Sequence, residues 1–220
     1  MTLRRAPAPI LLTGFAPFGP DAGNPSWDLA RALRGERIGQ RLVHAARLPV
    51  EFGAALEALD RALDRHAPML VLCLGLAGGR SEVSLERVAI NVDDARIPDN
   101  AGQQPVDAPV VPGGLAAYFS SLPIKAMCQA MRQAGCPAGI SQTAGTYVCN
   151  HVFYGLMHRL AQRPGVRGGF VHVPYSPKQA ARHPGAPGLA VETVVPALRK
   201  ALAVALRTRG DLAMAAGAEH

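Results

Sequence analysis

Short apolar runs alternate along this chain with stretches in which apolar side chains recur every three or four residues. Runs at residues 10–13, 69–74 and 169–173 have the length and the boundaries that predict buried strands. Apolar residues between 52 and 63 instead follow the spacing of one helix face. This alternation predicts an α/β domain with several parallel strands.

Further elements carry their own boundary signals. Asn24 is a residue type that caps helix N-termini and Pro25 suits the first helical position, so a helix is predicted from there to Leu33. No internal repeat or composition break divides the chain. The same reasoning predicts strands at residues 42–46, 83–92 and 138–143 and helices at 124–135, 150–160 and 191–207.

Two proline-rich segments interrupt the alternation, at residues 93–112 and 174–187. Long ordered loops in compact domains are usually functional, which makes the first segment a candidate part of a site. Residues 75–80 form a shorter glycine-rich segment after a predicted strand. It lacks the Lys-Ser/Thr ending of a phosphate-binding loop, and its glycine spacing does not match a dinucleotide-binding fingerprint. We therefore interpret it as a tight turn that leaves the strand.

Length and composition fit a single domain over residues 1–220, with a frayed tail from about residue 208. A chain of 220 residues with 49% hydrophobic and 18% charged residues can bury its own core and is neither disordered nor a coiled coil. Its apolar runs are far shorter than the roughly 20 residues of a membrane span, and its N-terminus lacks a signal-peptide core. We therefore expect a cytoplasmic protein without a membrane partner.

The formal charge of +7 raises the question of a polyanionic partner. The basic residues, mostly arginines, are scattered along the chain without a basic run or interleaved aromatic residues. We therefore expect no nucleic-acid partner. The histidines and acids show no metal-ligand spacing, so we expect no metal and no cofactor.

Of the four cysteines, Cys149 has the position of a nucleophile. It lies where a predicted strand gives way to a helix, and the free N–H groups of a helix N-terminus favour a thiolate. Cys73 and Cys128 fall on apolar strand and helix positions, where thiols are inert, and Cys136 lacks an evident partner. The spacing indicates free thiols rather than a disulfide framework.

A cysteine nucleophile needs a base, and His172 is the candidate. If Cys149 starts a helix at the carboxyl edge of the sheet, that helix and the following strand return His172 to the same edge. His151 and His158 lie about 180° to 200° around the helix from Cys149 and cannot share its face. A histidine within a strand is otherwise more often a satisfied core residue than a catalyst.

A third group usually orients such a base, and Glu86 is our candidate because it follows the glycine-rich segment. Glu82, Asp93 and Asp94 lie in the same region and are competitors. Spacing does not choose among the four carboxylates. A surface ion pair with Arg87 is the alternative role for Glu86.

Three long segments resemble signatures of the pyroglutamyl peptidase I family, cysteine peptidases also called pyrrolidone carboxyl peptidases. Residues 75–91 are similar to the signature around the family's active-site glutamate, and residues 140–150 to the signature around its nucleophile. Residues 170–174, Phe-Val-His-Val-Pro, are similar to its histidine element. The resemblance implies a Cys149, His172 and Glu86 triad.

The resemblance also covers the N-terminal Thr-Gly-Phe-Ala-Pro-Phe-Gly motif at residues 13–19 and so most of the chain. It implies that Phe15 and Phe18 hold a flat lactam ring, that Asn24 orders the site, that Tyr147 lines the pocket, and that Arg96 lies near the oxyanion. Leu76 departs from relatives that carry glutamine there. By resemblance we further expect a three-layer α/β/α sandwich around a mixed, largely parallel sheet, and a homo-oligomer, either tetramer or dimer.

The activity implied is hydrolysis of the amide bond after an N-terminal pyroglutamyl residue, through an acyl-enzyme. One alternative is an amidase that uses the same three residues on another lactam or amide, which activity profiling would separate. Another is a non-catalytic small-molecule-binding domain, whose function would survive Cys149→Ala. Fold alone does not choose, because function resides in the site.

Overall fold

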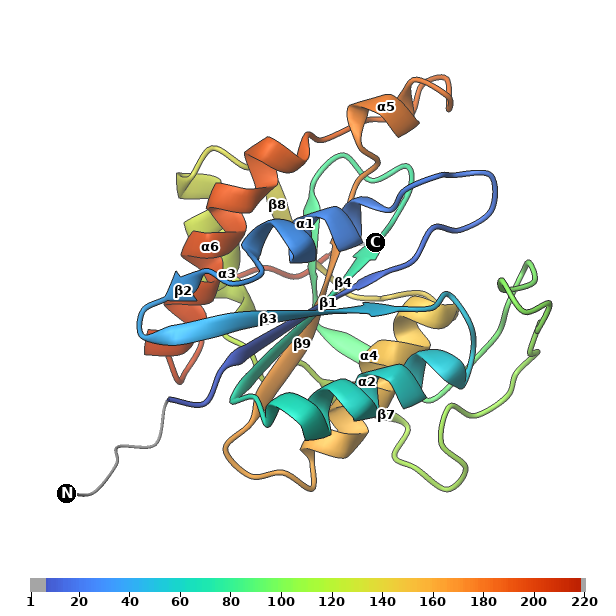
Figure 1. Cartoon of the computed structure of the whole chain (residues 1–220), viewed down its shortest axis with the longest axis horizontal. Coiled ribbons are helices and arrows are strands. Elements are labelled where there is room, and N and C mark those ends of the chain that lie inside the picture. The colour runs from blue at the N-terminus through green and yellow to red at the C-terminus, as the bar shows by residue number, and fades with distance from the viewer. Residues whose placement is uncertain (1–6, 219–220) are drawn as a thin grey trace.

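A seven-stranded sheet forms the centre of the structure (Figure 1). The computed structural model describes residues 7–218. Two further strands, β6 (Val88–Ile90) and β7 (Ala117–Phe119), form a separate antiparallel pair. The order in the main sheet is β2-β3-β1-β4-β9-β5-β8, and its strands are β1 Ile10–Phe15, β2 Arg37–Ile38, β3 Arg41–Leu48, β4 Leu70–Leu76, β5 Val83–Glu86, β8 Ala138–Ser141 and β9 Arg167–Val173.

Four neighbouring strands, β3, β1, β4 and β9, run parallel, whereas β5 pairs with β9 in the antiparallel sense and β8 runs parallel to β5. This confirms the mixed, largely parallel sheet. Strands β8 and β9 therefore point in opposite directions, and α4 connects two antiparallel strands of the sheet. Only residues 77–82 separate β4 from β5, too few for the crossover that a parallel return requires.

Helices cover both faces of the sheet, which gives three layers (Figure 1). Leu29, Met127 and Leu198 belong to one apolar core, and Leu59 and Phe153 to the other. The first face carries α1 (Pro25–Leu33), α3 (Ile124–Gln133) and α6 (Val191–Arg207), the second carries α2 (Ala54–His66) and α4 (Val148–Leu160), and the short α5 (Pro177–Ala180) lies outside the layers. The α/β class and the long helices are those that the apolar pattern predicts.

Helix α1 packs closely onto the end of β1, and this contact positions the N-terminal motif. The Asn24 side chain caps the helix by accepting from the Ser26 N–H, as predicted. A side chain at Gly14 would come within 2.4 Å of the Ser26 carbonyl oxygen, so only glycine permits this approach. The Ser26 hydroxyl in turn accepts a hydrogen bond from the Phe15 N–H. The motif thus folds over the carboxyl end of β1.

The segment after α6 also lies on the folded domain. The Asp211 carboxylate accepts hydrogen bonds from the N–H groups of Lys125 and Ala126 at the start of α3. Further along, the Ala216 carbonyl accepts from Arg87. None of the helices between residues 7 and 218 has the length and apolar character that crossing a membrane requires.

Candidate active site

Cys149 lies in the first turn of α4, with its sulfur against the carboxyl end of β4. A Cβ atom added to Gly75 would stand 2.9 Å from Cys149 Sγ and 2.7 Å from the Phe170 ring. Gly75 is also the partner of His172 in the β4 and β9 pairing. The structure therefore brings the predicted nucleophile and the predicted base to the same place on the sheet.

The His172 imidazole is buried and bound to a buried carboxylate. Its Nδ1 lies 2.7 Å from Glu86 Oε1, with 3% of His172 and none of Glu86 exposed. Arg80 Nη1 donates to the same Glu86 oxygen over 2.6 Å. Because a carboxylate only accepts, Nδ1 carries the proton and Nε2 is left as an acceptor.

Burial of the Cys149 thiol favours its neutral form in the free site. Burial, followed by the negative charge of Glu86, raises the pKa of Cys149 to about 12, and Arg80 opposes this. Burial also lowers the pKa of His172, against the effect of Glu86. Both shifts favour the neutral thiol and the neutral imidazole.

Cys149 and His172 do not form a hydrogen bond with each other in the described part of the chain. Catalytic hydrogen bonds often tighten only when substrate binds. No side chain caps the N-terminal end of α4, where Cys149 lies, and no acidic residue occupies its first turn. The positive end of the helix dipole therefore lies at Cys149 without a neutralising side chain of the helix's first turn.

A cavity of about 360 Å³ opens beside the thiol. All five residues that the sequence analysis assigned to substrate binding line it, together with Cys149. The remaining wall is mixed apolar and polar, as in many small-molecule sites. The lining residues are Phe15, Phe18, Asn24, Val50, Leu76, Gly78, Asp94, Arg96, Ile97, Thr146, Tyr147, Val148, Cys149 and Tyr175.

Contacts with neighbouring residues hold several of the side chains that line the cavity. Phe18 and Tyr147 pack with ring centres 5.7 Å apart, and the Tyr147 hydroxyl donates to the Pro98 carbonyl. Burial raises the pKa of Tyr147 to about 12, so the phenol stays protonated. Asn24 uses its amide to bind Ala16 O and the Ser26 N–H, which makes it a structural support of the cavity.

The structure separates the four carboxylates that spacing left open. Glu86 contacts His172, whereas Asp94 lines the cavity. Glu82 lies against the backbone of Gly139. Asp93 binds His151, at 2.7 Å from Nδ1. The alternative role for Glu86, a surface ion pair with Arg87, is wrong, because Glu86 is buried and the cation it pairs with is Arg80.

Arg80, Thr146 and Tyr175 are among the residues of the site that were not singled out from the sequence. Arg80 ends the glycine-rich segment, where a cation six residues before Glu86 was a usable signal. Thr146 and Tyr175 reach the cavity from irregular segments and left no periodic pattern to read. Within residues 7–218, nowhere do three or more His, Cys, Asp or Glu side chains gather as a metal-ion site would require.

Comparisons with known proteins agree with this geometry. A family model described as pyroglutamyl peptidase matches residues 8–208. The chain is 61% identical over 213 residues to the pyrrolidone-carboxylate peptidase of Cupriavidus taiwanensis, covering 96% of this chain and 99% of that one. It is 55% identical over 211 residues to the pyrrolidone-carboxylate peptidase of Escherichia fergusonii, and this match covers 96% of this chain and 99% of that one.

Solved structures show the same fold. The crystal structure of Bacillus amyloliquefaciens pyroglutamyl peptidase I superposes with a TM-score of 0.91 at 42% identity, covering 94% of this chain and all of that one. Pyrrolidone carboxyl peptidase from Thermococcus litoralis superposes with a TM-score of 0.89 at 36% identity, and the match covers 94% of this chain and 99% of that one. The chain therefore belongs to the pyroglutamyl peptidase family.

Proposed function

We propose that this protein is a cysteine peptidase that hydrolyses the amide bond after an N-terminal pyroglutamyl residue. The observation that carries this proposal is the cavity that ends at Cys149, beside the buried Glu86 and His172 pair. A lactam ring is flat and uncharged, which suits the aromatic side chains of Phe15 and Phe18. Family membership supports the same activity.

In the first step, Cys149 Sγ attacks the pyroglutamyl carbonyl carbon while its proton passes to Nε2 of His172. Glu86 holds the imidazole in the tautomer that accepts this proton and stabilises the imidazolium that results. The carbonyl oxygen gains negative charge at the uncapped N-terminus of α4. Loss of one such donor typically costs about 3 kcal/mol of transition-state stabilisation. Arg96, on the cavity wall, adds positive charge near this oxygen.

In the second step, the imidazolium gives its proton to the departing amine and the carbon–nitrogen bond breaks. This leaves a thioester between Cys149 and the pyroglutamyl group. His172 then takes a proton from water as the water oxygen attacks the thioester. Release of pyroglutamate returns the proton to the sulfur and restores the resting site.

Selectivity follows from the aromatic side chains that line the cavity. A peptide with a free N-terminal glutamate would bring an ammonium group against Phe15 and Phe18, and burying an unpaired charge is costly. We therefore test turnover of a pyroglutamyl fluorogenic amide against the matching glutamyl amide, with a chelator present. Turnover confined to the pyroglutamyl compound supports the proposal. Turnover of neither compound by folded protein overturns it, and preference for another lactam favours a different amidase.

We also propose that the protein works in the cytoplasm as a homo-oligomer. Val106, Leu115 and Phe119 expose 64% to 70% of their surface, and such apolar side chains are favourable at subunit contacts. Light scattering after size exclusion should give a dimer or tetramer mass. A monomer mass at micromolar concentration would contradict the assembly, and cell fractionation tests the location.

A further inference from the structure

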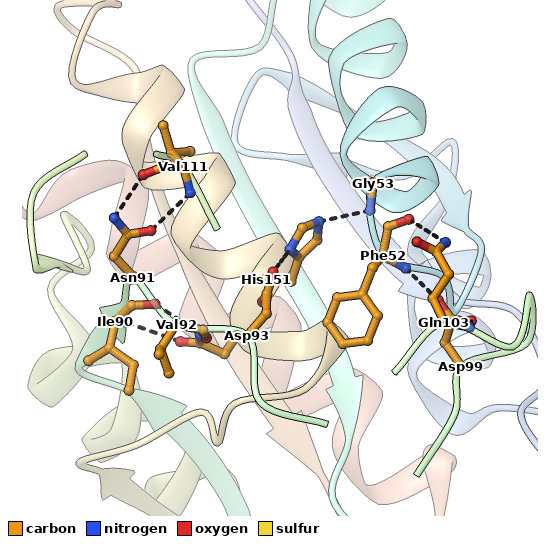
Figure 2. Close-up of polar contacts among 11 residues, drawn as sticks. Phe52, Gly53, Ile90, Asn91, Val92, Asp93, Asp99, Gln103, Val111 and His151 are labelled. Atoms are coloured by element: carbon orange, nitrogen blue, oxygen red, sulfur yellow. Dashed lines mark hydrogen bonds and ion pairs between the residues drawn. The ribbon is translucent and has the colours of Figure 1, made fainter. Parts of the chain in front are cut away.

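Residues 94–98, called the wall loop here, include three residues that line the cavity. Hydrogen bonds through His151 and residues 52–53 connect Asp93 and Asp99, the residues on either side of this loop (Figure 2). Oδ2 of Asp93, the residue just before the wall loop, lies 2.7 Å from His151 Nδ1. His151 Nε2 accepts from the Gly53 N–H over 3.0 Å. The neighbouring Phe52 N–H donates over 2.8 Å to Asp99, just after the wall loop. His151 therefore joins the two ends of the loop through residues 52–53.

The donors and acceptors fix the state of His151. A backbone N–H only donates, so His151 Nε2 must accept the hydrogen bond from Gly53. The proton must then be on Nδ1, which donates a hydrogen bond to the Asp93 carboxylate. Both ring nitrogens are thus used, and only 6% of His151 is exposed. A leucine at this position would leave the Gly53 N–H and the Asp93 carboxylate without their partner.

The loop that this chain closes carries part of the cavity lining. Asp94, Arg96 and Ile97 all line the cavity. Arg96 is exposed and Ile97 keeps 47% of its surface exposed, so little packing holds either side chain. Hydrogen bonds from Asp94 to Thr146 and from Ala95 to Pro105 hold the first part of the loop, and its position otherwise depends on how its two ends are held.

A second route links His151 to the cavity through aromatic rings. Phe52 packs edge-on against His151 at 5.3 Å and against Tyr147 at 5.4 Å. Tyr147 in turn packs on Phe18, and its hydroxyl binds the Pro98 carbonyl at the end of the wall loop. The first route thus leads from His151 to the wall loop, and the second leads to Phe18 in the cavity.

We propose that His151 is a positioning residue that sets substrate affinity by holding the wall loop against the cavity. This inference rests on the proposed peptidase function. His151 lies about 200° around α4 from Cys149, so its side chain points away from the sulfur. Its loss should therefore weaken binding more than it slows the chemical step.

The kinetic test compares three variants on the pyroglutamyl amide. His151→Leu should raise KM about tenfold and change kcat by less than about twofold. His151→Gln should stay within about threefold of wild-type KM, because its amide can donate to Asp93 and accept from Gly53. His158→Leu is the matched control, since His158 lies on the same helix and binds Tyr118 instead.

A second readout needs no activity. Trypsin cuts after Arg96 when the wall loop opens, so His151→Leu should be cleaved there about tenfold faster than wild type or His158→Leu. Should His151→Leu not fold, His151→Asn, whose amide is too short to span both partners, takes its place.

Wild-type KM and wild-type cleavage in a folded variant would overturn the inference, as would a loss confined to kcat. Absence of turnover in the wild type would instead count against the peptidase function, while the cleavage comparison would still test His151.

Discussion

Glu86 and His172 are joined by a buried 2.7 Å contact, and the same carboxylate oxygen also receives Arg80 over 2.6 Å. The second carboxylate oxygen, Oε2, is buried without a hydrogen-bond partner in the described part of the chain. A single oxygen of Glu86 therefore both orients the His172 imidazole and accepts the hydrogen bond from Arg80. Both contacts should be visible in the kinetics of variants.

Glu86→Gln should lower kcat by about 100-fold or more while KM changes little, because an amide neither holds the tautomer as firmly nor stabilises the imidazolium. Steady-state kinetics on the pyroglutamyl amide provide the measurement. Glu57→Gln, on the exposed face of α2, is the control and should leave kcat unchanged. A Glu86→Gln enzyme with wild-type kcat would remove Glu86 from the mechanism.

Arg80→Met should shift the acidic limb of the kcat/KM profile to higher pH. Burial lowers the pKa of His172 most, and the positive charge of Arg80 lowers it further. Without Arg80 the pKa rises, so a higher pH is needed to keep the imidazole in its neutral, proton-accepting form. Arg61→Met, at an exposed ion pair, should leave the limb in place. A shift to lower pH would contradict this account.

Gly75→Ala should reduce kcat/KM by at least about tenfold, because the new methyl group would press on both the sulfur of Cys149 and the Phe170 ring. Gly210→Ala is the control, since nothing lies within 4 Å of a side chain at Gly210. Alkylation of Cys149 by iodoacetamide measures access to the sulfur directly. Unchanged alkylation and turnover would mean that the site tolerates the added atom.

Asp211→Ala should lower the free energy of unfolding by about 1 kcal/mol, because the carboxylate supplies the cap that Pro123 cannot give to α3. Denaturant titration measures this change. Asp211→Asn should lose less, since an amide oxygen still accepts both hydrogen bonds. Equal stability of the alanine variant would show that these contacts contribute nothing in solution.

The long elements were predictable from the sequence because their apolar periodicity and caps are local. Asn24 and Pro25 start α1, and the stripe from Val191 ends α6 at Arg207, as predicted. The strands β2 and β7 have two and three residues and no period to detect. The reversed direction of β5 and β8 depends on pairing partners far along the chain, which local patterns do not encode.

The site was partly predictable for the same reason. Cys149 could be found from its place at a helix start, and His172 from the geometry of one helix and one strand. Glu86 needed the family resemblance, because four carboxylates shared one region. The roles of His151 and Asp99 arise from contacts across 47 to 98 residues of sequence, so only the folded chain reveals them.

The proposed mechanism depends most on Cys149 as the nucleophile, and the most direct test compares wild type, Cys149→Ser and Cys136→Ser on the pyroglutamyl amide. Cys136 is a buried free thiol outside the site and serves as the matched control. Cys149→Ser should lose at least about 10³-fold in kcat while remaining folded, and Cys136→Ser should retain activity. Equal turnover by wild type and a folded Cys149→Ser variant would contradict the mechanism.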